Sequence, residues 1–148
     1  MATDAMPPDK LSIVVYAGHF DKVHYALVMA AAAAAIGRPV TLFFTMGACR
    51  ALAAADADGA PAWRSMPLSE GEGPGGERDD GYAGKGVATF EELLESCVQF
   101  GVKFMVCEMG LRAEGLEDQP LRDDVPIEKG GVVSFLNDAS KDGAVIFI

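Results

Sequence analysis

Residues 11–16 read LSIVVY, and this unbroken apolar stretch of strand length decides the fold. A run this apolar and rich in β-branched residues predicts a strand that is covered on both faces. A turn follows, and Asp21 is the expected N-cap of a helix over residues 22–36. That helix is apolar on almost every side, so we expect a neighbouring element or a second subunit to cover it. Residues 40–44, VTLFF, then predict a second buried strand.

The alternation of strands and helices continues to the end of the chain. Thr89 and Glu92 have the spacing of a capping box, which predicts the start of a helix that Gly101 ends. Further strands are expected at residues 102–106 and 144–148, and further helices at residues 47–55 and 131–139. Strands joined through helices by short connections are parallel, with right-handed crossovers. The sequence therefore predicts a three-layer α/β/α sandwich around a mainly parallel sheet of four or five strands.

Two segments do not fit this alternation. Residues 1–10, MATDAMPPDK, are polar and acidic and predict a disordered lead-in. Residues 56–87 are rich in glycine and acidic residues and predict a long flexible loop, which contains Trp63, the single tryptophan of the chain. Residues 11–148 are expected to form one domain, because a chain of 148 residues, half of them hydrophobic, has the size of an ordinary domain.

Composition and charge argue against several classes of partner. The formal net charge is −10 and the isoelectric point is near 4.5, without a stripe of Lys or Arg to interrupt this balance. Phosphate backbones are repelled by such a chain, so no nucleic-acid partner is expected. The most apolar stretch, residues 25–36, has about half of the roughly 20 residues needed to cross a bilayer, so no membrane span is expected. The N-terminus also lacks the basic and then apolar pattern of a signal peptide.

Three widely spaced cysteines, Cys49, Cys97 and Cys107, point to a reducing compartment. An odd number at this spacing does not make a disulfide framework, and no C-x-x-C or Cys/His spacing predicts a metal site. We therefore expect free thiols in the cytoplasm and neither a metal nor a cofactor.

Ligands of open parallel sheets bind at the carboxyl ends of the strands, where loops lead into helix N-termini. His19, Cys49 and Cys107 are expected at that edge, after the first, second and third strands. Cys107 is the strongest candidate, because N–H groups of the next turn stabilise a thiolate there. The neighbouring Glu108 disfavours the thiolate, so the reactivity of Cys107 should rest on exposure and geometry. The structural alternatives are that Cys107 packs under the turn, that Cys49 packs a helix start and that His19 is a solvated loop residue. Cys97 lies mid-helix, where a cysteine serves as a small hydrophobe.

Several blocks cover most of the chain outside the long loop: GHFDKVHYALVMA at 18–30, AAIG at 34–37, VTLFFT at 40–45, FEELL at 90–94, GV at 101–102, a Cys-x-Met motif at 107–109 and GGVVSFL at 130–136. Together they resemble the DsrE/DsrF-like family, in the branch whose members are described as peroxiredoxins. The resemblance implies a three-layer α/β/α fold, homo-oligomers that are trimers or larger, and a cysteine that carries persulfide sulfur in the cytoplasm. By position that cysteine is Cys107, with Met109 in the same motif and Lys22 at the family's Asp-Lys turn.

The resulting hypothesis is a sulfur carrier or sulfurtransferase. Cys107 would take sulfur from a donor protein or small persulfide and pass it to an acceptor thiol. The candidate auxiliary residues are His19, Lys22, Cys49 and Met109, although a dithiol role for Cys49 has no support from the resemblance. The competing hypothesis is a non-catalytic module that binds a small ligand or a partner at the same sheet edge, with Trp63 and residues 56–87 as a lid.

Overall fold

The computed structural model describes residues 6–148, and the first half of the predicted lead-in, residues 1–5, lies outside the described residues. A five-stranded sheet forms its centre, and every pairing in it is parallel, in the order β4-β3-β2-β1-β5. The strands are β1 Leu11–Val15, β2 Val40–Phe44, β3 Lys103–Cys107, β4 Ile127–Gly130 and β5 Ala144–Phe147. Within the described part of the chain, no helix has the length and apolar character needed to cross a membrane.

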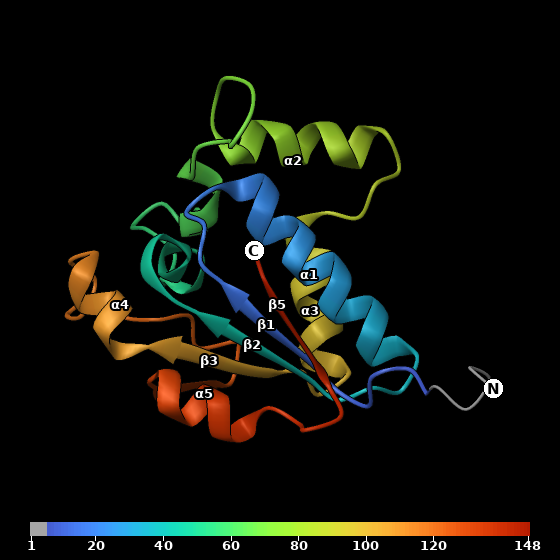
Figure 1. The fold of residues 1–148 in the computed structure, drawn as a ribbon. Helices are drawn as coiled ribbons and strands as arrows, with labels where there is room; N and C mark the ends of the chain where they lie inside the picture. The colour runs from blue at the N-terminus through green and yellow to red at the C-terminus, as the bar shows by residue number, and fades with distance from the viewer. Residues whose placement is uncertain (1–5) are drawn as a thin grey trace.

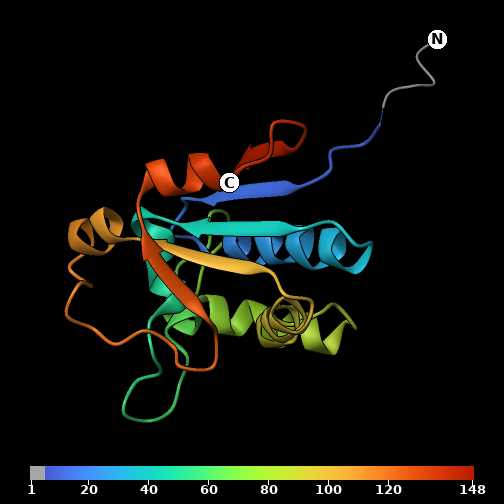
Figure 2. The same cartoon turned by 90° about the horizontal axis from the view of Figure 1, so that it is seen from below.

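Helices lie on both faces of the sheet (Figure 1). α1 Phe20–Ala35 and α3 Phe90–Gln99 pack together over one face, and the seven-residue α5 Val132–Asp138 lies on the other (Figure 2). α4 Glu108–Ala113 and the 3-10 helix η2 Met46–Leu52 follow β3 and β2 at the carboxyl edge of the sheet. These layers confirm the predicted three-layer α/β/α sandwich.

The side chains of β3 show how the two faces of the sheet differ. Phe104 points into the large core under α1 and α3, whereas Met105 and Cys107 point to the other side, where Phe43 and Phe135 complete a much smaller cluster. Phe43 of β2 and Phe135 of α5 stack with their ring centroids 5.1 Å apart. Because side chains alternate along a strand, every second residue of β3 faces the side that has only one short helix over it.

The first helix begins earlier than the sequence predicts. Its first residue is Phe20, so His19 takes the N-cap position, without a side-chain cap, and Asp21 is not the N-cap. Asp21 instead accepts hydrogen bonds from the backbone N–H and the hydroxyl of Ser69. A short polar side chain can bond a distant backbone as well as its own helix, and here the distant contact ties α1 to the segment 56–87.

The ends of the prediction also need correction. The backbone N–H of Asp9 donates to the carbonyl of Asp142 over 3.2 Å, and Lys10 reaches Asp138 over 2.8 Å. The prediction of a disordered lead-in over residues 1–10 is therefore wrong for residues 9 and 10. β4 is not predicted, because its residues, IEKG, are mostly polar and form one edge of the sheet.

The segment 56–87 is not the continuous loop that its composition predicts. It contains the 3-10 helix η3 Ala62–Ser65 and the ten-residue helix α2 Gly75–Gly84, which lies at the top of Figure 1. Trp63 is 1% exposed and stacks on Phe90 with ring centroids 4.5 Å apart. The indole is part of the core, so the expectation that Trp63 serves as a lid is wrong. Flexibility of the turns between these helices stays a prediction.

An ionic cluster holds the end of α5 against the sheet. The carboxylate of Asp138 accepts hydrogen bonds from Lys10 Nζ at 2.8 Å, Thr41 Oγ1 at 2.5 Å and Lys103 Nζ at 2.9 Å. Partial burial disfavours the charged carboxylate, but these three donors outweigh it and hold the pKa of Asp138 well below its ordinary value. The cluster therefore links α5 to β2, to β3 and to the residue before β1.

Replacing Asp138 with asparagine is expected to lower the free energy of unfolding at pH 7 by about 1–3 kcal/mol, because two lysines lose their shared carboxylate. The pKa of Asp138 is lower in the folded chain than in the unfolded chain. Its contribution is therefore complete above the unfolded value of about 4 and is lost as the pH falls further. Denaturant unfolding of both proteins should show a large difference at pH 7 and a smaller one near pH 2; equal differences would contradict a role of the charge.

Candidate functional site

Three loops meet at the carboxyl edge of the sheet, after β1, β2 and β3. Close backbone contacts hold them together: a β-carbon on Gly47 would lie 2.9 Å from the Cα of Gly18, and one on Gly110 would lie 2.5 Å from the backbone nitrogen of Met46. Both distances are too short for a real β-carbon, so the two contacts require glycine. Met46 itself has a φ of 48°, in the left-handed region that residues with side chains rarely adopt.

Cys107 is the last residue of β3 and the N-cap of α4. Its Sγ accepts a hydrogen bond from the backbone N–H of Gly110 at 3.4 Å. The side chain, however, is only 1% exposed, packed in the cluster with Phe43, Met105 and Phe135, so the expected exposure is not found. A reaction of Cys107 with another molecule therefore requires this cover to open.

The other two cysteines are buried as well. Cys97 lies in α3, where burial raises the pKa of its thiol to about 12, in keeping with the predicted structural role. Cys49 lies in η2, and a β-carbon on Gly110 would stand 3.2 Å from its Sγ. Burial, then the nearby Cys107 and Glu114, raise the pKa of Cys49 to about 12. Gly110 thus lies close to both thiols.

His19, Lys22 and Met109 take different places. His19 precedes α1 at the carboxyl edge, and its Nδ1 is buried with no hydrogen-bond partner among the described residues. Lys22 is exposed on the first turn of α1, and Met109 is 60% exposed on α4. Of the predicted site residues, Cys49 and Cys107 both lie against Gly110, although their side chains pack in different hydrophobic clusters.

Sequence reasoning missed three residues at this contact, Thr45, Met46 and Gly110. Thr45 Oγ1 lies 3.1 Å from the place that a β-carbon on Gly110 would take, on the same side as Cys49. The available signal is a glycine three residues after the end of each of the first three strands, at Gly18, Gly47 and Gly110. A glycine at a strand end marks a close approach of two backbones, but the pattern does not say which loops approach each other.

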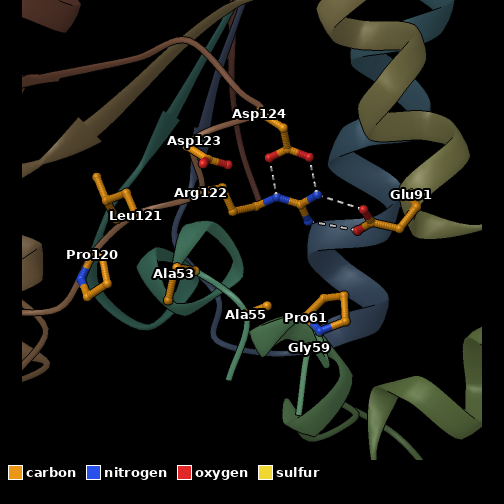
Figure 3. Close-up of a pocket in the computed structure, with 11 residues that line it drawn as sticks. Ala53, Ala55, Gly59, Pro61, Glu91, Pro120, Leu121, Arg122, Asp123 and Asp124 are labelled. Carbon is orange, nitrogen blue, oxygen red and sulfur yellow. Dashed lines mark hydrogen bonds and ion pairs between the residues drawn. The ribbon is translucent and has the colours of Figure 1, made fainter. Parts of the chain in front are cut away.

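A groove opens at the same edge of the sheet, on the side of α3 (Figure 3). Two adjoining hollows of about 660 Å³ and about 540 Å³ share walls formed by Ala53, Ala54, Ala55, Pro61 and Pro120. One wall is held to the other by the backbone N–H of Ala54, which donates to the carbonyl of Pro120 at 2.9 Å. Cys107 lines neither hollow.

Arg122 lies in the wall of the larger hollow, between two carboxylates (Figure 3). It donates to both oxygens of Glu91, at 2.6 Å and 2.8 Å, and to both oxygens of Asp124, at 2.7 Å and 2.9 Å. These carboxylates raise the pKa of Arg122, and the guanidinium lowers the pKa of Asp124. Arg122 is therefore already neutralised and does not present a free positive charge to an anionic ligand.

Similarity to known proteins extends over most of the chain. Residues 9–147 match the model of the DsrE/DsrF-like family. Over 158 aligned residues the chain is 28% identical to the protein YrkE of Bacillus subtilis (strain 168), covering 94% of this chain and 96% of that protein. The crystal structure of the YchN protein from E. coli is similar with a TM-score of 0.55 at 17% sequence identity, over 97% of this chain and 100% of that chain. At this identity the likeness to YchN shows the fold alone.

Proposed function

This chain belongs to the DsrE/DsrF-like family, and we propose that it is a cytoplasmic sulfur carrier that passes persulfide sulfur through Cys107. The family points to a function in sulfur relay. The choice of Cys107 rests on one observation, the hydrogen bond that its Sγ accepts from the backbone N–H of Gly110 at the carboxyl end of β3. This contact fixes the sulfur at the edge of the sheet where ligands of open parallel sheets bind.

The proposed step is a nucleophilic displacement at sulfur. The Cys107 thiolate attacks the outer sulfur of a donor persulfide, R–S–SH, so that a new S–S bond forms while the donor's S–S bond breaks and the donor leaves as a thiolate. Cys107 then holds the sulfur as a persulfide until an acceptor thiolate attacks the same outer sulfur. Donor and acceptor are proteins or small persulfides and thiols.

A sulfur donor can react with the buried Cys107 only if part of the fold opens. α5 covers this side of the sheet with seven residues, and its buried anchor is Phe135. A short helix with one buried aromatic side chain opens at a lower cost in free energy than the long α1, which buries seven side chains. A transient opening of α5 is therefore the route by which we propose that sulfur reaches Cys107.

Replacing Cys107 with serine is expected to abolish sulfur uptake. Reduced protein is incubated with polysulfide, and mass spectrometry should show a gain of about 32 Da for each sulfur atom on the peptide that contains Cys107. The matched control is Cys97→Ser, which removes another buried thiol and should leave the gain unchanged. A gain on Cys49 or Cys97 with Cys107 unmodified would contradict the assignment.

We also propose that the chain forms a homo-oligomer, a trimer or larger, through the face that carries α5. On this face Val133 is 72% exposed, Leu136 59% and Phe147 66%, and the rings of Phe147 and Tyr16 lie against each other with centroids 5.3 Å apart. An apolar patch of this kind on one face of a sheet indicates a surface that a second subunit covers.

Sedimentation at tens of micromolar protein should therefore show an oligomer. Val133→Glu is expected to shift it toward the monomer, because the carboxylate would be buried in the contact. Val87→Glu, at an exposed valine of the turn after α2, is the matched control and should leave the oligomer intact. A monomeric wild-type protein would contradict the proposed contact.

A binding module at the sheet edge is the second candidate, favoured by the groove beside Arg122 with its two hollows of about 660 Å³ and about 540 Å³. The groove is separate from the thiols, so a protein that acts through it does not need Cys107. If the groove is the working site, a Cys107→Ser variant should restore function in a strain that lacks the protein. If the protein is a sulfur carrier, the same variant should not restore it.

A further inference from the structure

Cys49 and Cys107 lie against the same small residue. Cys107 Sγ accepts the N–H of Gly110 at 3.4 Å, and Cys49 Sγ is 3.2 Å from the place of a β-carbon on Gly110. Their elements follow neighbouring parallel strands, since η2 comes after β2 and Cys107 ends β3. The third thiol, Cys97, is elsewhere in the core, 3.8 Å from the carbonyl of Leu27 in α1.

We propose that Cys49 is a resolving thiol for the persulfide on Cys107, so that a loaded carrier without an acceptor releases sulfide and closes as a Cys49–Cys107 disulfide. This inference rests on the proposed function of Cys107. It gives the site a second outcome besides transfer to an acceptor, and it assigns a role to a thiol that the transfer itself does not use.

The chemistry balances without a further oxidant. The sulfur of Cys49 attacks the Sγ of Cys107, which is the inner sulfur of the persulfide. A bond between the two Sγ atoms forms, and the bond from Cys107 Sγ to the outer sulfur breaks. The outer sulfur leaves with the bonding electrons and takes up the proton of Cys49, so it is released as hydrogen sulfide. The sulfur of Cys49 is oxidised in the step that reduces the outer sulfur, and the oxidation state of Cys107 Sγ does not change.

The surroundings of Cys49 make this step slow at neutral pH. Its Sγ lies 3.8 Å from the carbonyl of Phe44, and burial, Cys107 and Glu114 raise its pKa to about 12, with Glu114 itself paired to Arg50 at 3.2 Å. Since the thiolate is the attacking form, the rate of resolution should rise about tenfold for each pH unit between about pH 7 and 9. An acceptor that reacts faster than Cys49 takes the sulfur first. Only a carrier that keeps its persulfide without meeting an acceptor releases sulfide.

Discharge stops the carrier until it is reduced. The disulfide has no thiolate with which to accept sulfur, so a thiol or dithiol reductant has to restore the two cysteines before the next round. The pair therefore limits how long persulfide sulfur is stored and couples reloading to the supply of reductant.

The test follows the wild-type chain and two variants after loading. Reduced protein is treated with polysulfide, freed from excess reagent and incubated without an acceptor, while released sulfide and intact mass are measured. Wild type should lose the added mass of about 32 Da, release one sulfide and end about 2 Da below the reduced chain, with a cross-linked peptide that joins Cys49 and Cys107. Cys49→Ser should keep its persulfide and release sulfide at a rate at least about tenfold lower than that of wild type. Cys97→Ser should behave as wild type.

The outcomes separate this inference from the proposed function. A persulfide on Cys107 that lasts equally long in wild type and Cys49→Ser overturns the resolving role and leaves the carrier intact. Transfer of the added sulfur to Cys49, without a disulfide, also overturns it. Absence of a persulfide on Cys107 even in Cys49→Ser defeats the proposed function itself.

A second measurement needs neither a variant nor persulfide loading. Folded, reduced wild-type protein is oxidised briefly with diamide and mapped by mass spectrometry under non-reducing conditions. The expected product is a Cys49–Cys107 disulfide with Cys97 still reduced. A disulfide that contains Cys97, or no intramolecular disulfide in the folded chain, would show that Cys49 does not reach Cys107 and would overturn the inference.

Discussion

Replacing Trp63 with alanine is expected to lower the free energy of unfolding by about 3–5 kcal/mol, the range for truncating a large buried aromatic side chain. The indole is 1% exposed, stacks on Phe90 at 4.5 Å and lies 5.5 Å from the ring of Phe20, centroid to centroid. Its Nε1 also donates to Glu91 at 2.7 Å, so the substitution removes a hydrogen bond as well as apolar contacts. Denaturant unfolding measures the loss.

Trp63→Phe separates the two contributions. A phenyl ring keeps most of the stacking and loses the N–H donor, so we expect a loss of about 1–2 kcal/mol. Limited proteolysis of Trp63→Ala should also show earlier cleavage within residues 56–87 than in wild type, because the indole anchors that segment. A loss below about 1 kcal/mol for the alanine variant would mean that this segment does not contribute to the core.

Replacing Gly110 with alanine is expected to destabilise the chain by about 1–3 kcal/mol, and by more if the loops cannot yield. The added β-carbon would stand 2.5 Å from the backbone nitrogen of Met46 and 3.2 Å from Cys49 Sγ. The backbone of Met46 cannot rotate away as a side chain does, so α4 or η2 has to shift. In an isolated helix the same substitution stabilises by about 1 kcal/mol, so the sign of the change reports the contact.

Gly131→Ala is the matched control for Gly110→Ala. A β-carbon on Gly131 would meet no atom within 4 Å, and its backbone is extended, with φ −133° and ψ −178°. We expect no change or a gain of about 0.4–1 kcal/mol in the free energy of unfolding, because alanine restricts the unfolded chain. If both variants behave alike, the close contact between α4 and the loop after β2 is not a constraint.

Local patterns in the sequence are enough to place most of the sheet. Residues 11–16 and 40–44 are apolar runs bounded by turn residues, and the structure has β1 and β2 there. The capping box of Thr89 and Glu92 is present with both of its hydrogen bonds at the start of α3. These elements are predictable because each depends on neighbours within a few residues, and a parallel sheet buries whole strands.

α2 could not be found in this way. Its residues, GGERDDGYAG, include four glycines, and glycine is a poor helix former. The helix is held by contacts with distant residues: Gly75 packs against the ring of Phe20, and Asp79 accepts the backbone N–H of Phe90 at 2.8 Å. Because these contacts join residues that are distant in the sequence, no pattern of nearby residues predicts them.

Some features of the candidate site can likewise be predicted from the sequence, and others depend on the tertiary structure. A cysteine at the end of a buried strand, followed by a glycine one turn later, is visible in the chain, and so are the other two thiols. The burial of Cys107 under α5 follows from packing between segments about thirty residues apart, and the place of Cys49 beside Gly110 rather than beside Cys97 from packing between segments about sixty residues apart. Residue types and short spacings reflect local backbone preferences, whereas the face of a sheet that a side chain occupies, its cover and its neighbours depend on how distant segments come together in space.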